Sequence, residues 1–231
     1  MNNLKYELTN NTSVYKNQTL YQIRALKDFA DVKKGDLGGY IAHENNLTHK
    51  DTCWVYGNAK VYDDAKVFGY TKVYGYAKVY GNAIVSDCAE VYDNAKVYGN
   101  AWIGGSAEVC GNAMVYGDSL VRNNAEVYDN AEVYDNAEVY DNAVLCNNAE
   151  VYGKAKIYGD CLIFGNVEVF EFAKVYGKVE ISDDAKVYGN AKVYDRAKVF
   201  DYAKVYDSAE VYGDAEVYGD SMIGGDEVMY E

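Results

Sequence analysis

Few residues in this 231-residue chain have the types and spacing that catalysis needs. Its only histidines, His43 and His49, could serve as general bases, but neither can be assembled with a nucleophile and an acid into a Ser-His-Asp set. The abundant Asp and Glu residues recur at regular intervals, which is typical of solvated carboxylates at turns and outer faces. The sequence therefore assigns no catalytic residue, and we lean toward a protein that is not an enzyme.

Cysteine spacing gives no indication of a metal site either. The five cysteines are scattered and form no CxxC pair: Cys53, Cys88, Cys110, Cys146 and Cys161. This pattern predicts reduced thiols, with neither a zinc site nor a disulfide framework. The glycines recur singly as turn residues and form no phosphate-binding loop. We therefore expect no metal and no cofactor.

A strict six-residue repeat must position the remaining side chains. From Val55 to Ile223 every sixth residue is Val, Ile or Leu, at 29 positions without an insertion, and a small residue, nearly always Ala, follows four residues later. The unit Val-Tyr-Gly/Asp-Asn/Asp-Ala-Lys/Glu predicts a very short strand and a tight turn, because Gly, Asp and Asn tolerate positive φ. A period of six fits a β-solenoid, in which each strand pairs with the coils above and below it.

Interruptions of the repeat indicate how many units make one coil. Ser86, Gly104 and Arg122 replace the usual aromatic residue at a spacing of 18. Three units per coil predict an all-β, three-sided parallel β-helix of about ten coils and about 46 Å. Residues 1–50 are expected to form a small N-terminal β cap, 51–226 the β-helix, and 227–231 a C-terminal tail, because Glu227 replaces a small inward residue.

Stacking of such coils also predicts ladders of identical side chains on the outer surface. An aromatic ladder is expected from Tyr62, Tyr80, Tyr98, Tyr116, Tyr134, Tyr152, Phe170, Tyr188 and Tyr206. An amide ladder is expected at one corner from Asn94, Asn112, Asn130, Asn148 and Asn166.

The unit V-x-x-x-A-x resembles the hexapeptide repeat of left-handed β-helix proteins, and the likeness covers residues 55–223. That family implies the left hand of the helix. Its trimeric LpxA-like members include acyltransferases that use a histidine base at a subunit boundary. Segment 20–55, which contains the short motifs GDLGGYI, NLT and CWV, is similar to the head of bacterial and phage hexapeptide-repeat proteins of the YdcK type. This second resemblance implies no established activity.

One face departs from the repeat over three consecutive coils. Apolar residues replace Lys or Glu there, next to positions that lack the aromatic residue: Ile84, Trp102 and Leu120 beside Ser86, Gly104 and Arg122. The pattern predicts an exposed apolar strip beside a shallow channel, and such patches mark interaction sites. A self-association face, a site for a protein or small-molecule partner, and packing against the head all remain open.

A second face carries a self-complementary column of charges. Successive coils place there Lys60, Lys78, Lys96, Met114, Glu132, Glu150 and Glu168. Reflection about Met114 sets each Lys opposite a Glu, so an antiparallel contact in a two-fold dimer would pair every charge. A patchwork of solvated charges without a partner is the other interpretation. We expect a homo-oligomer, and the family resemblance implies a trimer.

Charge and hydropathy limit the partners. The net charge is −14, which argues against nucleic acids and anionic membranes as ligands. The sequence has neither an apolar run of membrane-spanning length nor a signal peptide, so we expect a cytoplasmic protein. The interpretation is a non-catalytic, rigid interaction scaffold, with sequestration or inhibition of a partner as one form of it. The alternative is a trimeric hexapeptide-type acyltransferase in which His43 or His49 reaches a neighbour's groove.

Overall fold

The N-terminal cap begins the fold with an antiparallel hairpin. The computed structural model describes residues 4–231, and its first strands are β1 (Tyr6–Tyr15) and β2 (Gln18–Ala25), joined by Lys16 and Asn17 at φ 48° and 63°. Positive φ at both central residues is typical of a two-residue hairpin turn that matches strand twist. Strand β3 (Leu37–Ile41) pairs antiparallel with β2 and parallel with the body strand β5 (Lys60–Val61), so it connects the cap to the body.

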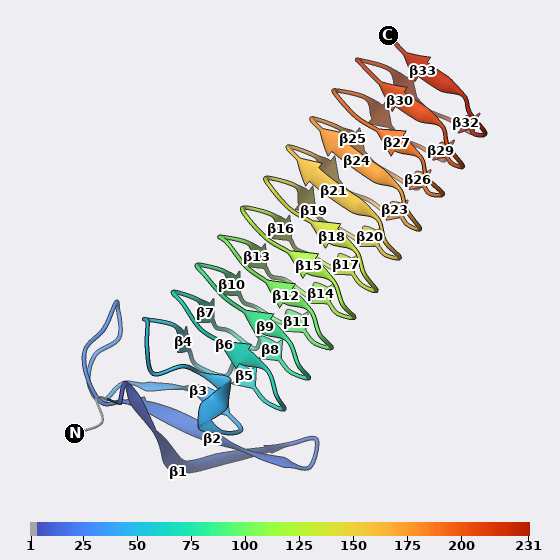
Figure 1. The fold of residues 1–231 in the computed structure, drawn as a ribbon. Helices are drawn as coiled ribbons and strands as arrows, with labels where there is room; N and C mark the ends of the chain where they lie inside the picture. Colours follow the sequence, from blue (N-terminus) through green and yellow to red (C-terminus); the bar gives the residue numbers. More distant parts are fainter. Residues whose placement is uncertain (1–3) are drawn as a thin grey trace.

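The body is a prism of three parallel sheets, each strand being followed by a strand of the next sheet (Figure 1). Sheet 1 continues from β3 through β5 (Lys60–Val61), β8 (Lys78–Val79), β11 (Lys96–Val97), β14 (Met114–Val115), β17 (Glu132–Val133), β20 (Glu150–Val151), β23 (Glu168–Val169), β26 (Lys186–Val187), β29 (Lys204–Val205) and β32 (Met222–Ile223).

Sheet 2 contains β4 (Trp54–Val55), β7 (Lys72–Val73), β10 (Glu90–Val91), β13 (Glu108–Val109), β16 (Glu126–Val127), β19 (Val144–Leu145), β22 (Leu162–Ile163), β25 (Glu180–Ile181), β28 (Lys198–Val199) and β31 (Glu216–Val217). Sheet 3 contains β6 (Lys66–Val67), β9 (Ile84–Val85), β12 (Trp102–Ile103), β15 (Leu120–Val121), β18 (Glu138–Val139), β21 (Lys156–Gly159), β24 (Lys174–Gly177), β27 (Lys192–Val193), β30 (Glu210–Tyr212) and β33 (Val228–Tyr230).

The strand pairing confirms the three-sided β-helix that the sequence predicts. Lys60 pairs with Lys78 and Trp102 with Leu120, so one coil takes three repeat units in both sheets. The inward Val and Ala side chains of all three sheets are fully buried in one continuous core, as expected. Within residues 4–231 the only helical element is the short 3-10 helix η1 (Glu44–Asn46).

The corners of the prism require backbone conformations with positive φ. Gly99 has a φ of +71°, and a Cβ there would lie only 2.9 Å from the backbone nitrogen of Gly117 in the next coil. Asp63 adopts a φ of 54°, and its carboxylate accepts a hydrogen bond of 3.2 Å from the N–H of Gly81. Gly and Asp therefore occupy most of these corner positions because both tolerate this conformation, and Asp also satisfies a backbone donor.

Aromatic rings stack along the outside in two ladders. The predicted ladder from Tyr62 to Tyr206 is confirmed, with neighbouring ring centroids 4.8–5.4 Å apart. A second ladder, which the sequence analysis did not identify, lies on sheet 3 and contains Tyr140, Tyr158, Tyr176, Tyr194, Tyr212 and Tyr230.

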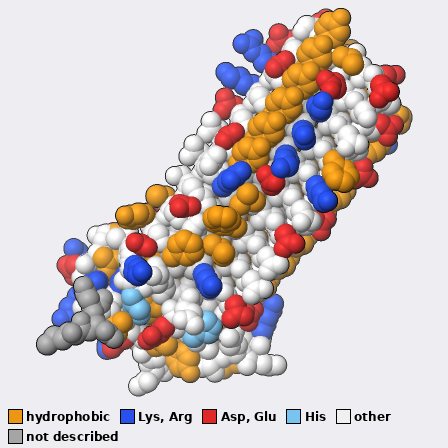
Figure 2. Space-filling view, viewed as in Figure 1, with side chains coloured by type: hydrophobic (Ala, Val, Ile, Leu, Met, Phe, Trp, Pro, Cys, Tyr) orange, Lys and Arg blue, Asp and Glu red, His pale blue; other side chains and the backbone are white. Residues whose placement is uncertain are grey.

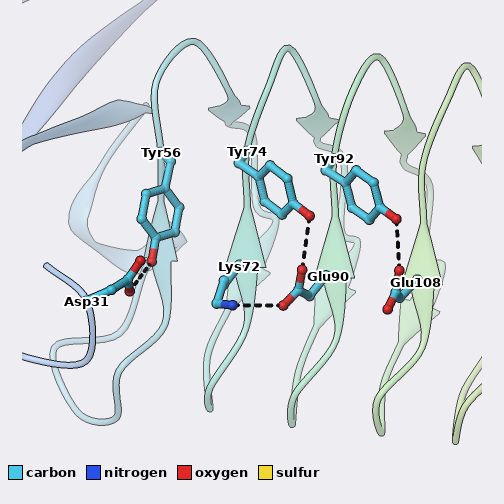
Figure 3. A network of polar contacts seen from close by, with 7 residues as sticks. All are labelled: Asp31, Tyr56, Lys72, Tyr74, Glu90, Tyr92 and Glu108. Atoms are coloured by element: carbon cyan, nitrogen blue, oxygen red, sulfur yellow. Dashed lines mark hydrogen bonds and ion pairs between the residues drawn. The ribbon is translucent and has the colours of Figure 1, made fainter.

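Tyrosine hydroxyls also join successive coils through glutamates. On sheet 2 the Tyr74 hydroxyl donates to Glu90 over 3.0 Å, and the Tyr92 hydroxyl donates to Glu108 over 2.8 Å (Figure 3). The same bond, always between a Tyr and the Glu that begins the equivalent strand of the next coil, recurs at Tyr116–Glu132, Tyr134–Glu150, Tyr152–Glu168 and Tyr194–Glu210. The repeat thus places a phenol where it can donate to a carboxylate at these positions, because a Glu begins the equivalent strand of the following coil.

Amide side chains form chains along the corners. In the predicted ladder, Asn112 donates to Asn130, Asn130 to Asn148 and Asn148 to Asn166 over 2.9–3.2 Å. The chain of side-chain bonds begins at Asn112 rather than at Asn94, and it ends on the carboxylate of Asp184. Because every amide donates in the same direction, the bonds polarise one another.

Parallel stacking extends further at both ends than the repeat alone indicates. Ile41 pairs with Val61 and Leu47 bridges to Val67, each pair being separated by slightly more sequence than a coil of the body, so part of the cap already forms a coil. At the other end β33 pairs with β30 and places Tyr230 beside Tyr212, although Glu227 precedes it. Glu227 is exposed at its corner, so its charge does not interrupt the stacking.

Alkali is expected to unfold the aromatic ladders and the β-helix together. Burial raises the pKa of Tyr80 to about 12, and burial together with the bond to Glu210 raises the pKa of Tyr194 to about 12. Folding therefore favours the neutral phenols, and this contribution is complete below about pH 10 and disappears as the pH rises toward 12. Phenolate absorbance and β-sheet circular dichroism should change together in this range. Ionisation of most phenols near pH 10 with unchanged dichroism would contradict the expectation.

Candidate functional site

The predicted apolar strip lies on three neighbouring strands of sheet 3. Trp102 of β12 pairs in register with Ile84 of β9 on one side and with Leu120 of β15 on the other. The Trp102 side chain is 48% exposed, whereas Ile84 is partly buried. The structure thus brings the three apolar residues together, with the indole at the centre.

Neighbouring residues hold the Trp102 indole in a single position. Its Nε1 donates a hydrogen bond of 2.9 Å to Oγ of Ser86, and this hydroxyl donates in turn to Oδ2 of Asp87 over 3.0 Å. The Asp87 carboxylate also accepts the N–H of Gly105 over 3.0 Å. A continuous network of hydrogen bonds fixes a side chain more firmly than packing alone. The indole is therefore both exposed and ordered.

The prediction of a shallow channel is wrong, because the indole of Trp102 fills the space beside Ser86 and Gly104. Ser86 is only 1% exposed, and its hydroxyl is engaged with the indole and with Asp87. A Cβ on Gly104 would lie 3.2 Å from Nε1 of Trp102 and 3.3 Å from Oγ of Ser86. Ser86 and Gly104 therefore act as positioning residues: one accepts the indole N–H and the other makes room for the ring.

Arg122 marks the boundary between the strip and the second aromatic ladder. Its guanidinium carbon lies 5.1 Å from the ring centroid of Tyr140, which is within cation–π distance. Tyr140 is the first ring of that ladder. The strip and the ladder are thus consecutive parts of one face.

A recess next to the strip combines Ile84 and His43, which the sequence singled out separately, with four residues that it did not. It has a volume of about 530 Å³ and is lined by His43, Asn45, Asp64, Lys66, Asn82 and Ile84. A second recess of about 520 Å³ adjoins it, shares Asn45 and Lys66 with it, and reaches His49. Figure 2 shows both histidine side chains near the cap end of this face. The cap therefore forms one wall of the candidate site.

Asn46 fixes this part of the cap on the body. Its amide nitrogen donates to the carbonyl oxygens of Asp63 and Ala65 over 2.9 and 2.8 Å. Its amide oxygen accepts the N–H groups of Ala42 and His43 over 3.1 and 3.0 Å. Asn46 is fully buried, and both its amide oxygen and its amide nitrogen are satisfied, as a buried amide requires. Leu47 bridges to Val67 at an offset slightly longer than one coil, so the spacing of the repeat gave no signal that placed this loop.

The two histidines have different surroundings. The His49 ring stacks on Tyr6 at 4.2 Å, and its Nδ1 accepts the backbone N–H of Lys5 over 3.3 Å. Burial lowers the pKa of His49 and favours the neutral imidazole. His43 lines the first recess, and its buried Nδ1 has no hydrogen-bond partner among residues 4–231. Of the two, only His43 faces the recess beside Ile84.

The cap also covers part of the predicted charge column on sheet 1. The Tyr15 ring lies over the Nζ atoms of Lys60 and Lys78 at 5.7 and 5.0 Å, and it packs edge-on against Tyr62. At the other end of the column, Lys186 already pairs with Glu168 over 2.5 Å. An antiparallel contact between two copies would have to displace the hairpin tip before Lys60 and Lys78 could meet their expected partners.

A further contact joins the cap to sheet 2. The Tyr56 hydroxyl donates to Asp31 of the cap over 2.8 Å, and Lys72 pairs with Glu90 at 3.0 Å beside it (Figure 3). These residues border a recess of about 340 Å³. The cap is thus attached on all three sides of the prism, which makes its position relative to the body definite.

Comparison with known families gives one match. Residues 107–123 match a family model described as YdcK Beta solenoid repeat. The matched segment spans β13, β14 and β15, which belong to successive sheets, and it includes Leu120 and Arg122 of the candidate site. No curated protein matches the chain. Among residues 4–231 there is no helix long and apolar enough to span a membrane and no cluster of residues suited to hold a metal ion.

Replacement of Gly104 tests how the indole is held. Gly104→Val should displace the ring and destabilise the fold by about 1–3 kcal/mol, because the added methyl groups overfill the space under it. Acrylamide quenching reports the displacement, since the other tryptophan, Trp54, is only 1% exposed. Ser86→Ala, which removes the acceptor and leaves the space, should give a smaller change. Unchanged quenching in Gly104→Val would contradict the geometry.

Removal of the Asn46 amide should loosen the cap. Asn46→Ala removes all four side-chain bonds, although the N–H of Ala42 keeps its bond to the carbonyl of Val61. The N–H of His43 and the carbonyls of Asp63 and Ala65 lose their partner, so we expect a loss of at least about 2 kcal/mol in urea unfolding. The neighbouring Asn45 is exposed, and Asn45→Ala should stay within about 0.5 kcal/mol of the parent. Equal stability of the two variants would show that Asn46 does not anchor the cap.

Proposed function

We propose that this chain, a β-helix repeat protein of the YdcK type, acts as a non-catalytic, rigid interaction scaffold that binds a protein partner at the Ile84–Trp102–Leu120 strip. One observation carries the proposal: Trp102 is half exposed and yet fixed by its bond to Ser86. Tryptophan is among the residues that contribute most to protein interfaces, especially at the centre of an apolar patch.

Preorganisation supports this role. Binding normally costs conformational entropy when exposed side chains and loops become ordered. Here the indole is already held by the Ser86 hydroxyl, and the strands beneath it are joined by backbone bonds such as Ile84 to Ala101 and Trp102 to Ser119. The strip can therefore meet a partner with little reorganisation.

The polar surroundings favour a protein partner of limited charge. Lys66 pairs with Ile84 at one end of the apolar strip, and Glu138 pairs with Leu120 at the other. The strip thus has a positive charge at one end and a negative charge at the other. A polar rim around an apolar centre is typical of protein interfaces. Sequestration or inhibition of that partner would follow if the strip covered the surface of the partner that matches it.

The alternative is an acyltransferase that acts as a trimer. It is favoured by one observation: His43 faces a recess of about 530 Å³ beside Asp64 and Lys66, on the same face as the strip. An imidazole there could accept a proton from an acceptor amine or hydroxyl during attack on a thioester. In this case acetyl-CoA consumption should depend on His43.

Replacement of Trp102 tests the scaffold. Trp102→Glu should weaken partner binding by about 30-fold or more, which corresponds to a hot spot of about 2 kcal/mol. Phe172→Glu is the matched control, because Phe172 is 53% exposed and lies outside the strip. Capture from the source cell identifies the partner, and titration of the purified pair with native mass measurement gives the affinity and the oligomeric state.

Two outcomes would count against the scaffold. One is unchanged oligomeric state and unchanged partner affinity in Trp102→Glu. The other is turnover of acetyl-CoA that is lost in His43→Gln and kept in Trp102→Glu, which would support the alternative.

A further inference from the structure

The second aromatic ladder forms a straight stripe on the C-terminal half of sheet 3. Its rings are parallel within 1–11°, and neighbouring centroids are 4.9–5.4 Å apart. Figure 2 shows a hydrophobic stripe on this face with basic side chains beside it. All of its rings are at least partly exposed, and Tyr230 at its end is 67% exposed.

Stacking determines which part of each ring a ligand can reach. Each inner ring is covered on both faces by its neighbours, so the ladder presents mainly ring edges to solvent. Aromatic edges carry partial positive charge and prefer to contact the face of another π-system. A sugar, which packs its C–H groups on an open ring face, is therefore a poorer match than a planar aromatic compound that lies flat along the ladder.

Basic residues flank the middle of this ladder on both sides. Lys174 and Lys192 precede Tyr176 and Tyr194 on their strands, while Lys178 and Arg196 border an adjoining recess of about 410 Å³. Lys174 and Lys178 have no carboxylate partner within residues 4–231.

Four carboxylates share this region, and contacts within the chain engage each of them. Asp160 accepts a hydrogen bond from the side-chain amide of Asn142 over 2.8 Å. Glu210 pairs with Lys192 at 2.6 Å, and Asp214 approaches Arg196 at 3.9 Å. Asp195 accepts the backbone N–H of Gly213 over 3.4 Å. Lys174 and Lys178 are therefore the basic residues of this region that no ion pair within residues 4–231 engages, on a chain whose net charge is −14.

The ladder on sheet 1 provides a built-in contrast. There Tyr116, Tyr134 and Tyr152 donate to Glu132, Glu150 and Glu168 over 2.9–3.0 Å. Its ring spacing is the same as that of the sheet 3 ladder, but carboxylates border its middle. The two ladders thus share their stacking and differ in the sign of the charge beside them.

We propose that the sheet 3 ladder is a binding site for an elongated, planar, anionic aromatic compound that lies parallel to the axis of the prism. The four rings from Tyr158 to Tyr212 span about 15 Å, given their spacing of 4.9–5.0 Å. This length suits a ligand with two or three linked aromatic rings, whose acidic groups face Lys174 and Lys178. The site is separate from the Trp102 strip and does not depend on the function proposed for it.

Two dyes of opposite charge serve as probes. Congo red is linear, aromatic and dianionic, whereas thioflavin T is linear, aromatic and cationic. We expect Congo red to bind the full chain with a shifted absorbance spectrum, and to bind less tightly when the salt concentration is raised from about 0.05 M to about 0.5 M. Absence of Congo red binding at low salt would overturn the proposal.

Matched variants locate the bound dye. Tyr176→Ala should weaken Congo red binding by about tenfold or more, and Lys174→Glu should weaken it severalfold without removing a ring. Tyr134→Ala removes a ring from the sheet 1 ladder and should leave Congo red affinity unchanged, while any binding of thioflavin T should show the opposite dependence. Circular dichroism confirms that each variant is folded. The proposal would be overturned if Tyr176→Ala and Tyr134→Ala lost the same Congo red affinity. It would also be overturned if neither Tyr176→Ala nor Lys174→Glu lost any.

Discussion

The backbone hydrogen bonds between successive coils support every other feature of this protein. An N–H group donates to a carbonyl oxygen of the following coil, as in Lys60 to Ala77 and Lys192 to Ala209, both over 2.9 Å. A strand of two residues has no stability of its own, so it exists only because neighbouring coils supply its partners. This requirement keeps the register constant along the prism, because an insertion within a two-residue strand would disrupt its pairing with the coils on both sides.

The same register explains the outer surface. Equivalent residues lie one coil apart, so identical side chains that interact favourably form ladders: rings stack, and amides donate to amides. Where a Glu begins the next coil's strand, the preceding Tyr hydroxyl donates to it, as Tyr134 does to Glu150. Repetition also makes exceptions visible. The exposed indole at Trp102 requires Ser86 and Gly104 where the repeat would place Tyr, since a ring at either position would occupy its space.

The candidate functional surface combines this regular body with an irregular cap. The strip at Trp102, the recess at His43 and the ladder that begins at Tyr140 all lie on sheet 3, and Arg122 joins the strip to the ladder. The cap covers part of sheet 1, where Tyr15 lies over Lys60 and Lys78. Sheet 3 is therefore the face on which contact with other molecules is best supported.

The sequence by itself determined the coil, its three sides, the inward Val and Ala, the long ladder from Tyr62 and the adjacency of Ile84, Trp102 and Leu120. All of these follow from periodicity, because a fixed repeat converts sequence spacing directly into distance. Only the tertiary structure decided that the indole fills the expected channel, that Asn46 fixes the cap beside Ile84, and that Tyr15 covers the charge column. These contacts depend on side-chain rotamers and on a cap without repeats, so no spacing rule could have given them.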